Sequence, residues 1–161
     1  MGDTEGSGRV EAIWLKRAHR GVMDPVDAAG FVEAEGIRDD ANFGRSKRQV
    51  TIIEKEVFDA IQEDLPQVEP SMRRANVMVS GRPLKESRGR ILRLGDVRIR
   101  IWGETRPCER MDAQVQGLTA ALDPAWNGGV YGVVLDSGTV QVGDRAALES
   151  DGAALEGEAT P

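Results

Sequence analysis

The feature that most constrains the fold is a series of short apolar runs separated by glycine and proline. In the run 97–102, three aliphatic residues alternate with two arginines and a tryptophan, so one face of an extended strand faces the core. Comparable runs predict further strands over residues 10–15, 49–53, 76–81, 91–94, 130–135 and 139–142. Many short strands joined by glycine and proline turns favour a β-barrel-like domain over a doubly wound fold.

Two helices complete the expected secondary structure. Apolar residues recur at helical spacing over residues 54–65, and Pro66 ends this helix. A second helix is expected around residues 115–122, before Pro124, whereas residues 17–25 are expected to form a loop. The predicted fold class is therefore mainly β with a few helices, in a β-barrel-like arrangement.

The length and composition allow one folded domain. The chain has 161 residues, of which 40% are hydrophobic and 30% are charged, an ordinary composition for a protein with its own core. We expect a flexible N-terminus over residues 1–8, a single domain over 9–148 and a disordered acidic tail over 149–161. No stretch approaches the roughly 18 apolar residues of a membrane span, and no signal peptide is recognisable. The expected location is cytoplasmic, without a membrane partner.

Cys108 is the only cysteine, and it lies between Arg106 and Arg110 just after the strand predicted over 97–102. The thiolate is the reactive form of cysteine, and nearby guanidinium groups lower a thiol pKa from about 8.5 into roughly the 3.5–7.5 range. The alternative is a buried structural thiol, because free cysteine often behaves as a small hydrophobe. With His19 as the only histidine, a zinc site or a Cys-His catalytic pair has few residues to draw on.

Basic residues are concentrated in the segment around the cysteine. Between Arg73 and Arg110 there are eleven basic and four acidic residues, although the whole chain has a formal net charge of −6. Ten of the eleven are arginines, whose planar guanidinium groups suit phosphate and carboxylate oxygens. An anionic ligand is one interpretation, and a solvated face of alternating strands is the other, favoured for Arg88, Arg90 and Arg93. The pI of about 4.9 and the few aromatic residues argue against nucleic-acid binding.

Several short motifs occur in the order found in one known family. They are Arg48-Gln49-Val50, Arg74-Ala75-Asn76-Val77, Leu94-Gly95-Asp96, Arg106-Pro107-Cys108, Gly129-Val130-Tyr131-Gly132 and Val142-Gly143-Asp144. Together they resemble the MOSC domain, named after the C-terminal domain of molybdenum cofactor sulfurase, and the resemblance spans roughly residues 10–148. Each motif alone is unspecific, so the ordered set, with the cysteine directly after Arg-Pro, carries the resemblance.

The resemblance implies a mainly β, barrel-like domain that binds molybdenum cofactor (molybdopterin) or carries sulfur. Cys108 is then the molybdenum ligand or the residue that holds sulfur as a persulfide, and some relatives reduce N-hydroxylated compounds with the cofactor. By the same resemblance, Arg48, Arg74 and Arg106 contact anionic groups of the pterin cofactor. Asn76 offers a polar side chain to the same site.

Two functions remain open at this point. Many relatives carry a histidine two positions after the acidic residue that corresponds to Asp40, where this chain has Asn42. The cysteine motif favours an enzyme or a sulfur-transfer component, whereas Asn42 favours a non-catalytic module that binds an anion or a partner. The active interpretations require a cysteine desulfurase or a separate electron-donor protein. For Arg48 and Arg74, a structural ion pair with a carboxylate such as Asp40 is the alternative to a role in the site.

Overall fold

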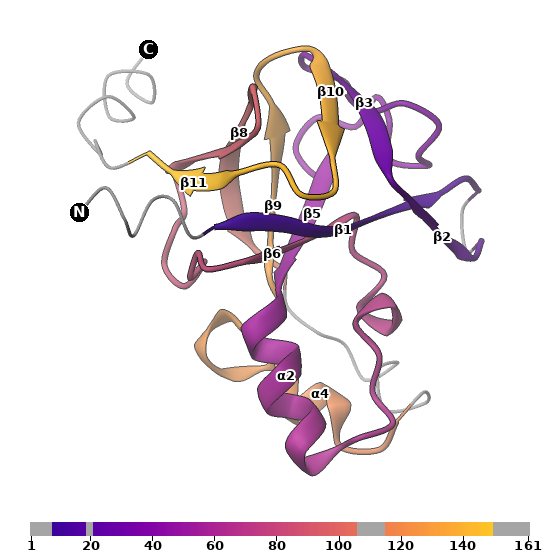
Figure 1. Cartoon of the computed structure of the whole chain (residues 1–161), viewed down its shortest axis with the longest axis vertical. Coiled ribbons are helices and arrows are strands. Elements are labelled where there is room, and N and C mark those ends of the chain that lie inside the picture. Colours follow the sequence, from indigo (N-terminus) through magenta and orange to yellow (C-terminus); the bar gives the residue numbers. More distant parts are fainter. Residues whose placement is uncertain (1–7, 19–20, 106–114, 150–161) are drawn as a thin grey trace.

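Strands dominate the part of the chain that a computed structural model describes, which is residues 8–18, 21–105 and 115–149 (Figure 1). The strands are β1 (Arg9–Lys16), β2 (Met23–Val26), β3 (Ala28–Val32), β4 (Gly36–Ile37), β5 (Val50–Glu54), β6 (Val77–Ser80), β7 (Ile91–Leu94), β8 (Val97–Glu104), β9 (Val130–Val134), β10 (Gly138–Gln141) and β11 (Ala146–Leu148). One sheet has the strand order β11-β7-β8-β9-β5-β6-β1-β2, and a smaller one has the order β10-β3-β4. The mainly β fold class predicted from the sequence is confirmed.

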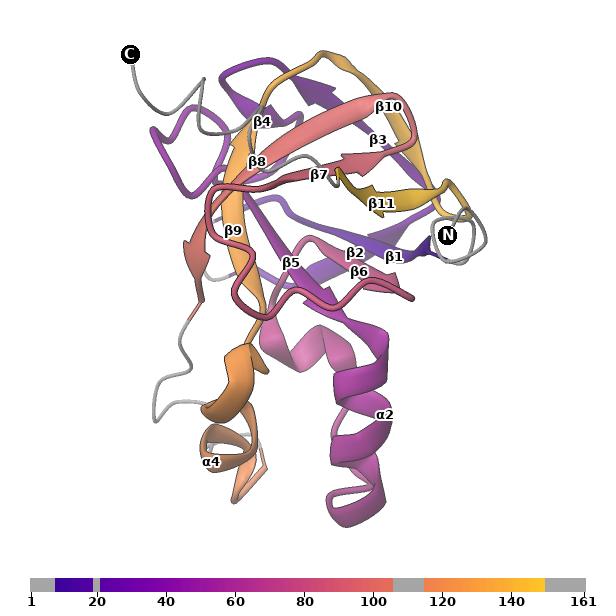
Figure 2. The ribbon, with the colours of Figure 1, turned by 90° about the vertical axis from the view of Figure 1, so that its left-hand side faces the viewer.

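In the described residues, two α-helices and two 3₁₀ turns accompany the sheets. They are α2 (Lys55–Asp64), η1 (Pro70–Arg73), α4 (Leu118–Leu122) and η2 (Pro124–Trp126). The helices lie together beyond one end of the strands (Figure 2). Phe58 and Ile61 of α2 are buried, because apolar residues at helical spacing place one face against the core. Within the described residues, no helix has the length and apolar character needed to cross a membrane.

A single crossover connects the only parallel neighbours among the described strands. β5 pairs with β6 in parallel, with Ile52 opposite Val77, whereas the other printed pairings are antiparallel. Parallel neighbours need a long connection, and α2 followed by η1 supplies it. This crossover brings the end of η1 and the start of β6 beside β5, where three of the predicted site residues lie.

The main core lies between the two sheets. Val97, Ile99 and Ile101 of β8 are fully buried, which confirms the apolar face predicted from alternation. Trp102, on the opposite face of the strand, is 40% exposed. A second cluster of buried residues joins the sheet to the helices and consists of Trp14, Ile53, Phe58, Ile61, Val68, Ala75, Met78, Val115, Leu118 and Leu122.

The prediction of a loop over residues 17–25 was wrong at its end. β2 occupies Met23–Val26 and pairs with β1, so that Pro25 lies opposite Trp14. A proline is tolerated there because β2 is the last strand in the sheet order, and its missing N–H interrupts no ladder on the outer side. β3 and β11 were not predicted, since neither run alternates clearly in the sequence.

The strand pairing does not close into a ring, so the barrel-like part of the prediction is not confirmed. The larger sheet nevertheless curls until the start of β1 meets the turn before β11 (Figures 1 and 2). The Val10 N–H donates to Asp144 O (2.8 Å), and the Gly143 N–H donates to Val10 O (2.8 Å). These bonds join the two described ends of the chain. Most of the two predicted tails lies outside the described residues.

Candidate anion-binding site

Thr105, the residue directly before the cysteine motif, is held in place by hydrogen bonds. Two predicted site residues, Arg106 and Cys108, lie outside the described residues, which end this stretch at Thr105. The buried Thr105 hydroxyl donates to Gly128 O (2.6 Å), and Arg73 Nη2 donates to Thr105 O (3.1 Å). Arg73 Nε also donates to Gly128 O (3.1 Å). The loop before β9 and the last residue of η1 therefore hold the point from which the cysteine motif begins.

Asn76 is buried just before β6, and its side-chain amide is fully used inside the protein. Its Nδ2 donates to Asp40 Oδ1 (3.0 Å) and to Trp14 O (3.3 Å). Its Oδ1 accepts from the Thr51 N–H (3.1 Å) and hydroxyl (3.2 Å). In this structure Asn76 positions Asp40 and joins β1, β5 and β6, while its predicted contact with a cofactor stays a prediction.

Asp40 is a buried carboxylate that accepts three hydrogen bonds. It is 5% exposed, and its Oδ1 accepts from the Lys16 backbone N–H (2.9 Å) as well as from Asn76. Its Oδ2 accepts from the Asn42 N–H (3.0 Å). A carboxylate held in this way is fixed in orientation, because each oxygen is tied to a donor. Asn42, at the position of the family histidine, is itself buried and its backbone shapes the same turn.

Arg48 and Arg74 act electrostatically on Lys16 and have partners other than this carboxylate. Arg74 follows η1 with a positive φ of 61°, and its Nη2 donates to Gly21 O at the far end of the β1–β2 connection. The Arg48 guanidinium lies over the Tyr131 ring, 5.0 Å from its centroid. Within the described part of the chain, neither guanidinium forms an ion pair with Asp40. The ion pair with Asp40 is therefore absent among the residues that the structure describes, although Arg74 does make a structural hydrogen bond to Gly21 O.

Three guanidinium groups act electrostatically on Lys16, and we call Lys16, Arg45, Arg48 and Arg74 the Lys16 cluster. Burial lowers the pKa of Lys16, the Asp40 carboxylate raises it, and the three guanidinium groups lower it further. Positive charge thus exceeds the single carboxylate that faces it. Like charges held together in a partly buried place attract an anion, since an anion relieves their repulsion.

A hollow of about 400 Å³ opens beside the cluster. It is lined by Arg45, Ser46, Lys47, Arg48 and Tyr131. Lys47 Nζ lies 5.1 Å from the centroid of the Trp102 ring. In the described residues, none of these three cationic side chains pairs with a carboxylate, so the hollow offers hydrogen-bond donors to an incoming anion.

Gln49 fixes the loop that carries these cations. Its Nε2 donates to Arg45 O (2.7 Å) and to Ala34 O (2.8 Å), and its Oε1 accepts from the Val134 N–H (3.0 Å). A buried amide with three bonds to backbone groups holds a loop as firmly as a strand ladder does. The sequence motif Arg48-Gln49 therefore combines a surface cation with a buried anchor.

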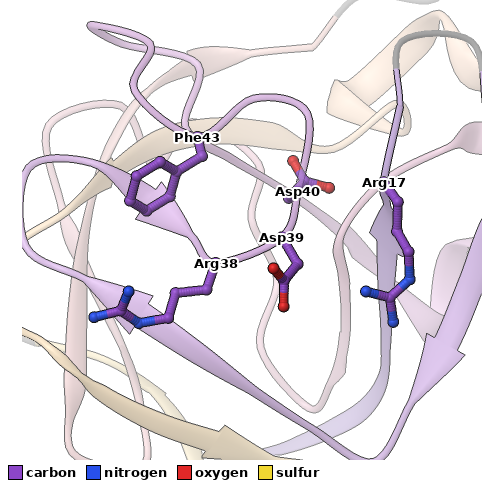
Figure 3. A pocket seen from close by; sticks show the side chains of 5 residues that line it. All are labelled: Arg17, Arg38, Asp39, Asp40 and Phe43. Atoms are coloured by element: carbon purple, nitrogen blue, oxygen red, sulfur yellow. The ribbon is translucent and has the colours of Figure 1, made fainter.

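A second hollow lies beside Asp40 (Figure 3). Its volume is about 510 Å³, and it is lined by Arg17, Arg38, Asp39, Asp40 and Phe43. Asp40 lines this hollow, and it also accepts a hydrogen bond from the backbone N–H of Lys16.

Comparisons with known proteins show which family the chain belongs to. A family model of the MOSC domain matches residues 39–147. The chain belongs to this family, which is associated with molybdenum cofactor. Among solved structures, the MOSC fold here is similar to the YuaD protein from Bacillus subtilis, with a TM-score of 0.72 and 22% identity over 88% of this chain and 94% of that chain.

Two further solved structures share the fold. YiiM from Geobacillus stearothermophilus has a TM-score of 0.68 and 18% identity over 89% of this chain and 75% of that chain. YiiM from Escherichia coli has a TM-score of 0.64 and 19% identity over 89% of this chain and 70% of that chain. At these identities the likeness shows the fold alone. No curated protein matches the chain significantly.

The candidate site contains residues that the sequence did not single out. Lys16 ends the apolar run of β1, and only the fold places it beside Arg45 and Asp40. Gln49 was quoted as part of a motif, without its role as an anchor. A weak signal for Lys16 existed, since a basic pair follows the apolar run directly, but such pairs are also common at solvent-exposed strand ends.

Proposed function

We propose that this MOSC domain binds molybdenum cofactor through the Lys16 cluster and that Cys108 is the molybdenum ligand or the sulfur carrier. The observation that carries the proposal is the grouping of three guanidinium groups around Lys16, beside a hollow lined by Arg45, Lys47 and Arg48. Molybdopterin is anionic at its phosphate and at its dithiolene, so these donors fit it. Charge-assisted hydrogen bonds from guanidinium groups to such oxygens are strong and directional.

The residues of the chain would share the work of holding the cofactor. Lys16, Arg48 and Arg74 would bind the phosphate, and Arg106 would add a further guanidinium by its place in the cysteine motif. Thr105, held by its bonds to the loop before β9, would fix where the cysteine motif begins. When bound, the cofactor supplies molybdenum, which exchanges electrons with substrates such as N-hydroxylated compounds, and a separate protein would deliver the electrons.

The sulfur-carrying form of the proposal uses the same cysteine differently. The Cys108 thiolate would attack the outer sulfur of a persulfide on a donor such as a cysteine desulfurase. A new sulfur–sulfur bond would form on Cys108, and the donor would leave as its thiolate. Neighbouring arginines would favour the thiolate needed for this attack. A cytoplasmic location belongs to the same proposal.

The test is the content of protein purified from a host that makes molybdenum cofactor and sulfur donors. A cofactor protein should contain molybdenum and pterin, whereas a sulfur carrier should show a mass increase of one sulfur atom that a reductant removes. Cys108→Ser should fold normally and lose the bound metal or sulfur, because a hydroxyl is a poor molybdenum ligand and holds no sulfane sulfur. Finding neither in the natural protein would overturn the proposal.

Variants of the Lys16 cluster test the binding role separately. Arg48→Gln should lower cofactor content at least about tenfold while leaving the fold intact, since a charged hydrogen bond to a ligand contributes about 1.5–3 kcal/mol. Arg93→Gln is the matched control, because Arg93 is an exposed arginine on β7 that pairs with Glu149. Equal losses in the two variants would contradict a specific role for the cluster.

A non-catalytic module that binds an anion or a partner is the second candidate. It is favoured by Asn42, which lies where many relatives have histidine and contributes to a buried turn. This candidate predicts anion binding at the Lys16 cluster without turnover and without a requirement for Cys108. Binding of inorganic phosphate that is equal in the natural protein and in Cys108→Ser, together with no molybdenum or sulfur, would support it.

A further inference from the structure

The second hollow, beside Asp39, contains charged groups that the fold leaves unused. Asp39 has a positive φ of 70° and an exposed side chain. In the part of the chain that the structure describes, neither Asp39 nor Arg38 has a hydrogen bond or ion pair through its side chain. Figure 3 shows the Asp39 carboxylate between the side chains of Arg38 and Arg17. Arg17 is paired through Nε with Asp24 (2.9 Å), so its remaining N–H groups stay available.

The wall of this hollow also offers an apolar surface. Phe43 lines it and is 41% exposed, although exposure of a large aromatic side chain to water is energetically unfavourable. The volume of about 510 Å³ lies within the range of roughly 300–1,000 Å³ that is typical of small-molecule sites. Asp40, the remaining lining carboxylate, is already occupied by its hydrogen bonds.

We infer that this hollow binds a small zwitterion with an apolar body. Its carboxylate would pair with Arg38, its ammonium group with Asp39, and its body would contact Phe43. The lining holds two guanidinium groups and two carboxylates, so neither a simple cation nor a simple anion is favoured over a molecule that carries both charges. An α-amino acid with an aromatic or long side chain has this combination of groups.

The hollow adjoins the Lys16 cluster through Asp40, which lines the hollow and whose carboxylate raises the pKa of Lys16. A zwitterion bound here would therefore lie next to the proposed cofactor site. Its role as a substrate rests on the proposed function, whereas its binding does not.

The test compares three related probes on the full chain, purified without cofactor. L-Phenylalanine carries both charges, 3-phenylpropionate lacks the ammonium group and 2-phenylethylamine lacks the carboxylate. NMR or calorimetric titration should show L-phenylalanine binding at least about fivefold more tightly than either other probe, the size expected for an additional well-placed charged hydrogen bond. Equal affinities, or no saturable binding by L-phenylalanine, would overturn the inference.

Two variants assign the charges. Asp39→Asn should weaken L-phenylalanine at least about fivefold and leave 3-phenylpropionate unchanged or tighter, because only the former presents an ammonium group. Arg38→Gln should weaken the binding of L-phenylalanine and of 3-phenylpropionate, which carry a carboxylate, and should not weaken the binding of 2-phenylethylamine. The matched control is Asp96→Asn, which removes an exposed carboxylate in the β7–β8 turn. An equal effect of this control would overturn the assignment.

The outcomes separate this inference from the proposed function. If the natural protein contains neither molybdenum nor bound sulfur but binds L-phenylalanine through Asp39, the zwitterion site is supported and the zwitterion is not a substrate of the proposed cofactor. If cofactor is present and the three probes bind alike, only the zwitterion site falls.

Discussion

At Lys16 the fold lowers the pKa of a side chain, and this shift makes the stability of the protein depend on pH. Burial lowers its pKa below the ordinary value of 10.5, with the nearby guanidinium groups adding to the effect and Asp40 opposing it. Folding therefore disfavours the protonated amine. This penalty is fully present below the folded pKa and disappears as the pH rises from that pKa to 10.5, the value of the unfolded chain.

The resulting prediction is that the natural protein gains stability relative to Lys16→Met as the pH rises from neutral towards 10.5. Urea unfolding at a series of pH values measures the difference in free energy between the two proteins. Lys85→Met, which removes an exposed lysine, should show no comparable trend. A difference for Lys16→Met that is flat or falls with rising pH would contradict the lowered pKa.

At the level of elements, the start of β9 depends on a backbone approach that only glycine permits. Gly129 has a φ of +94°, and a Cβ there would lie 2.2 Å from Ile52 O of β5. Gly143 has a similar φ of +99°, but a Cβ there would meet nothing within 4 Å. A side chain at either position would be strained by the positive φ, but only a side chain at position 129 would also clash with β5. Gly129 also accepts the Thr105 N–H (2.8 Å), so this element supports the entrance to the cysteine motif.

Gly143→Ala should cost about 1–2 kcal/mol of stability, the price of a positive φ at a residue with a side chain. Gly129→Ala should cost at least about 2 kcal/mol more, since β9 must also move away from β5. Thermal unfolding of both variants measures the difference, and circular dichroism shows whether Gly129→Ala still folds. Similar melting temperatures for Gly129→Ala and Gly143→Ala would contradict this prediction, because they would mean that β9 can move away from β5 at little cost.

At the level of the whole molecule, the two described ends of the chain support each other. The segment 143–146 bonds to residues 8–10, and β11 pairs with β7 at the edge of the larger sheet. Removing residues 150–161 should leave the melting temperature unchanged, because their composition offers little apolar surface to bury. Removing residues 143–161 should abolish cooperative unfolding, since it deletes β11 and those bonds. Equal melting curves for the two truncations would contradict a stabilising role for this junction.

Local pattern in the sequence determined much of the secondary structure. Alternation predicted the buried face of β8, helical spacing predicted α2, and Pro66 predicted where that helix stops, because these signals act over a few residues. The order of short motifs identified the family and with it the mainly β fold. Arg48 and Arg74 were named from the same motifs, and the fold does bring their charges close to Lys16.

Only the tertiary structure decided which residues share a site. Lys16, Arg45 and Arg74 come from β1, the loop before β5 and the end of η1, and they meet because β1 and β5 both flank β6. The roles of Asn76 and Gln49 were equally hidden, since a buried amide is satisfied by backbone groups that are distant in sequence. β3 and β11 pair with β10 and β7, which are distant in sequence, and local propensity does not encode such long-range pairing.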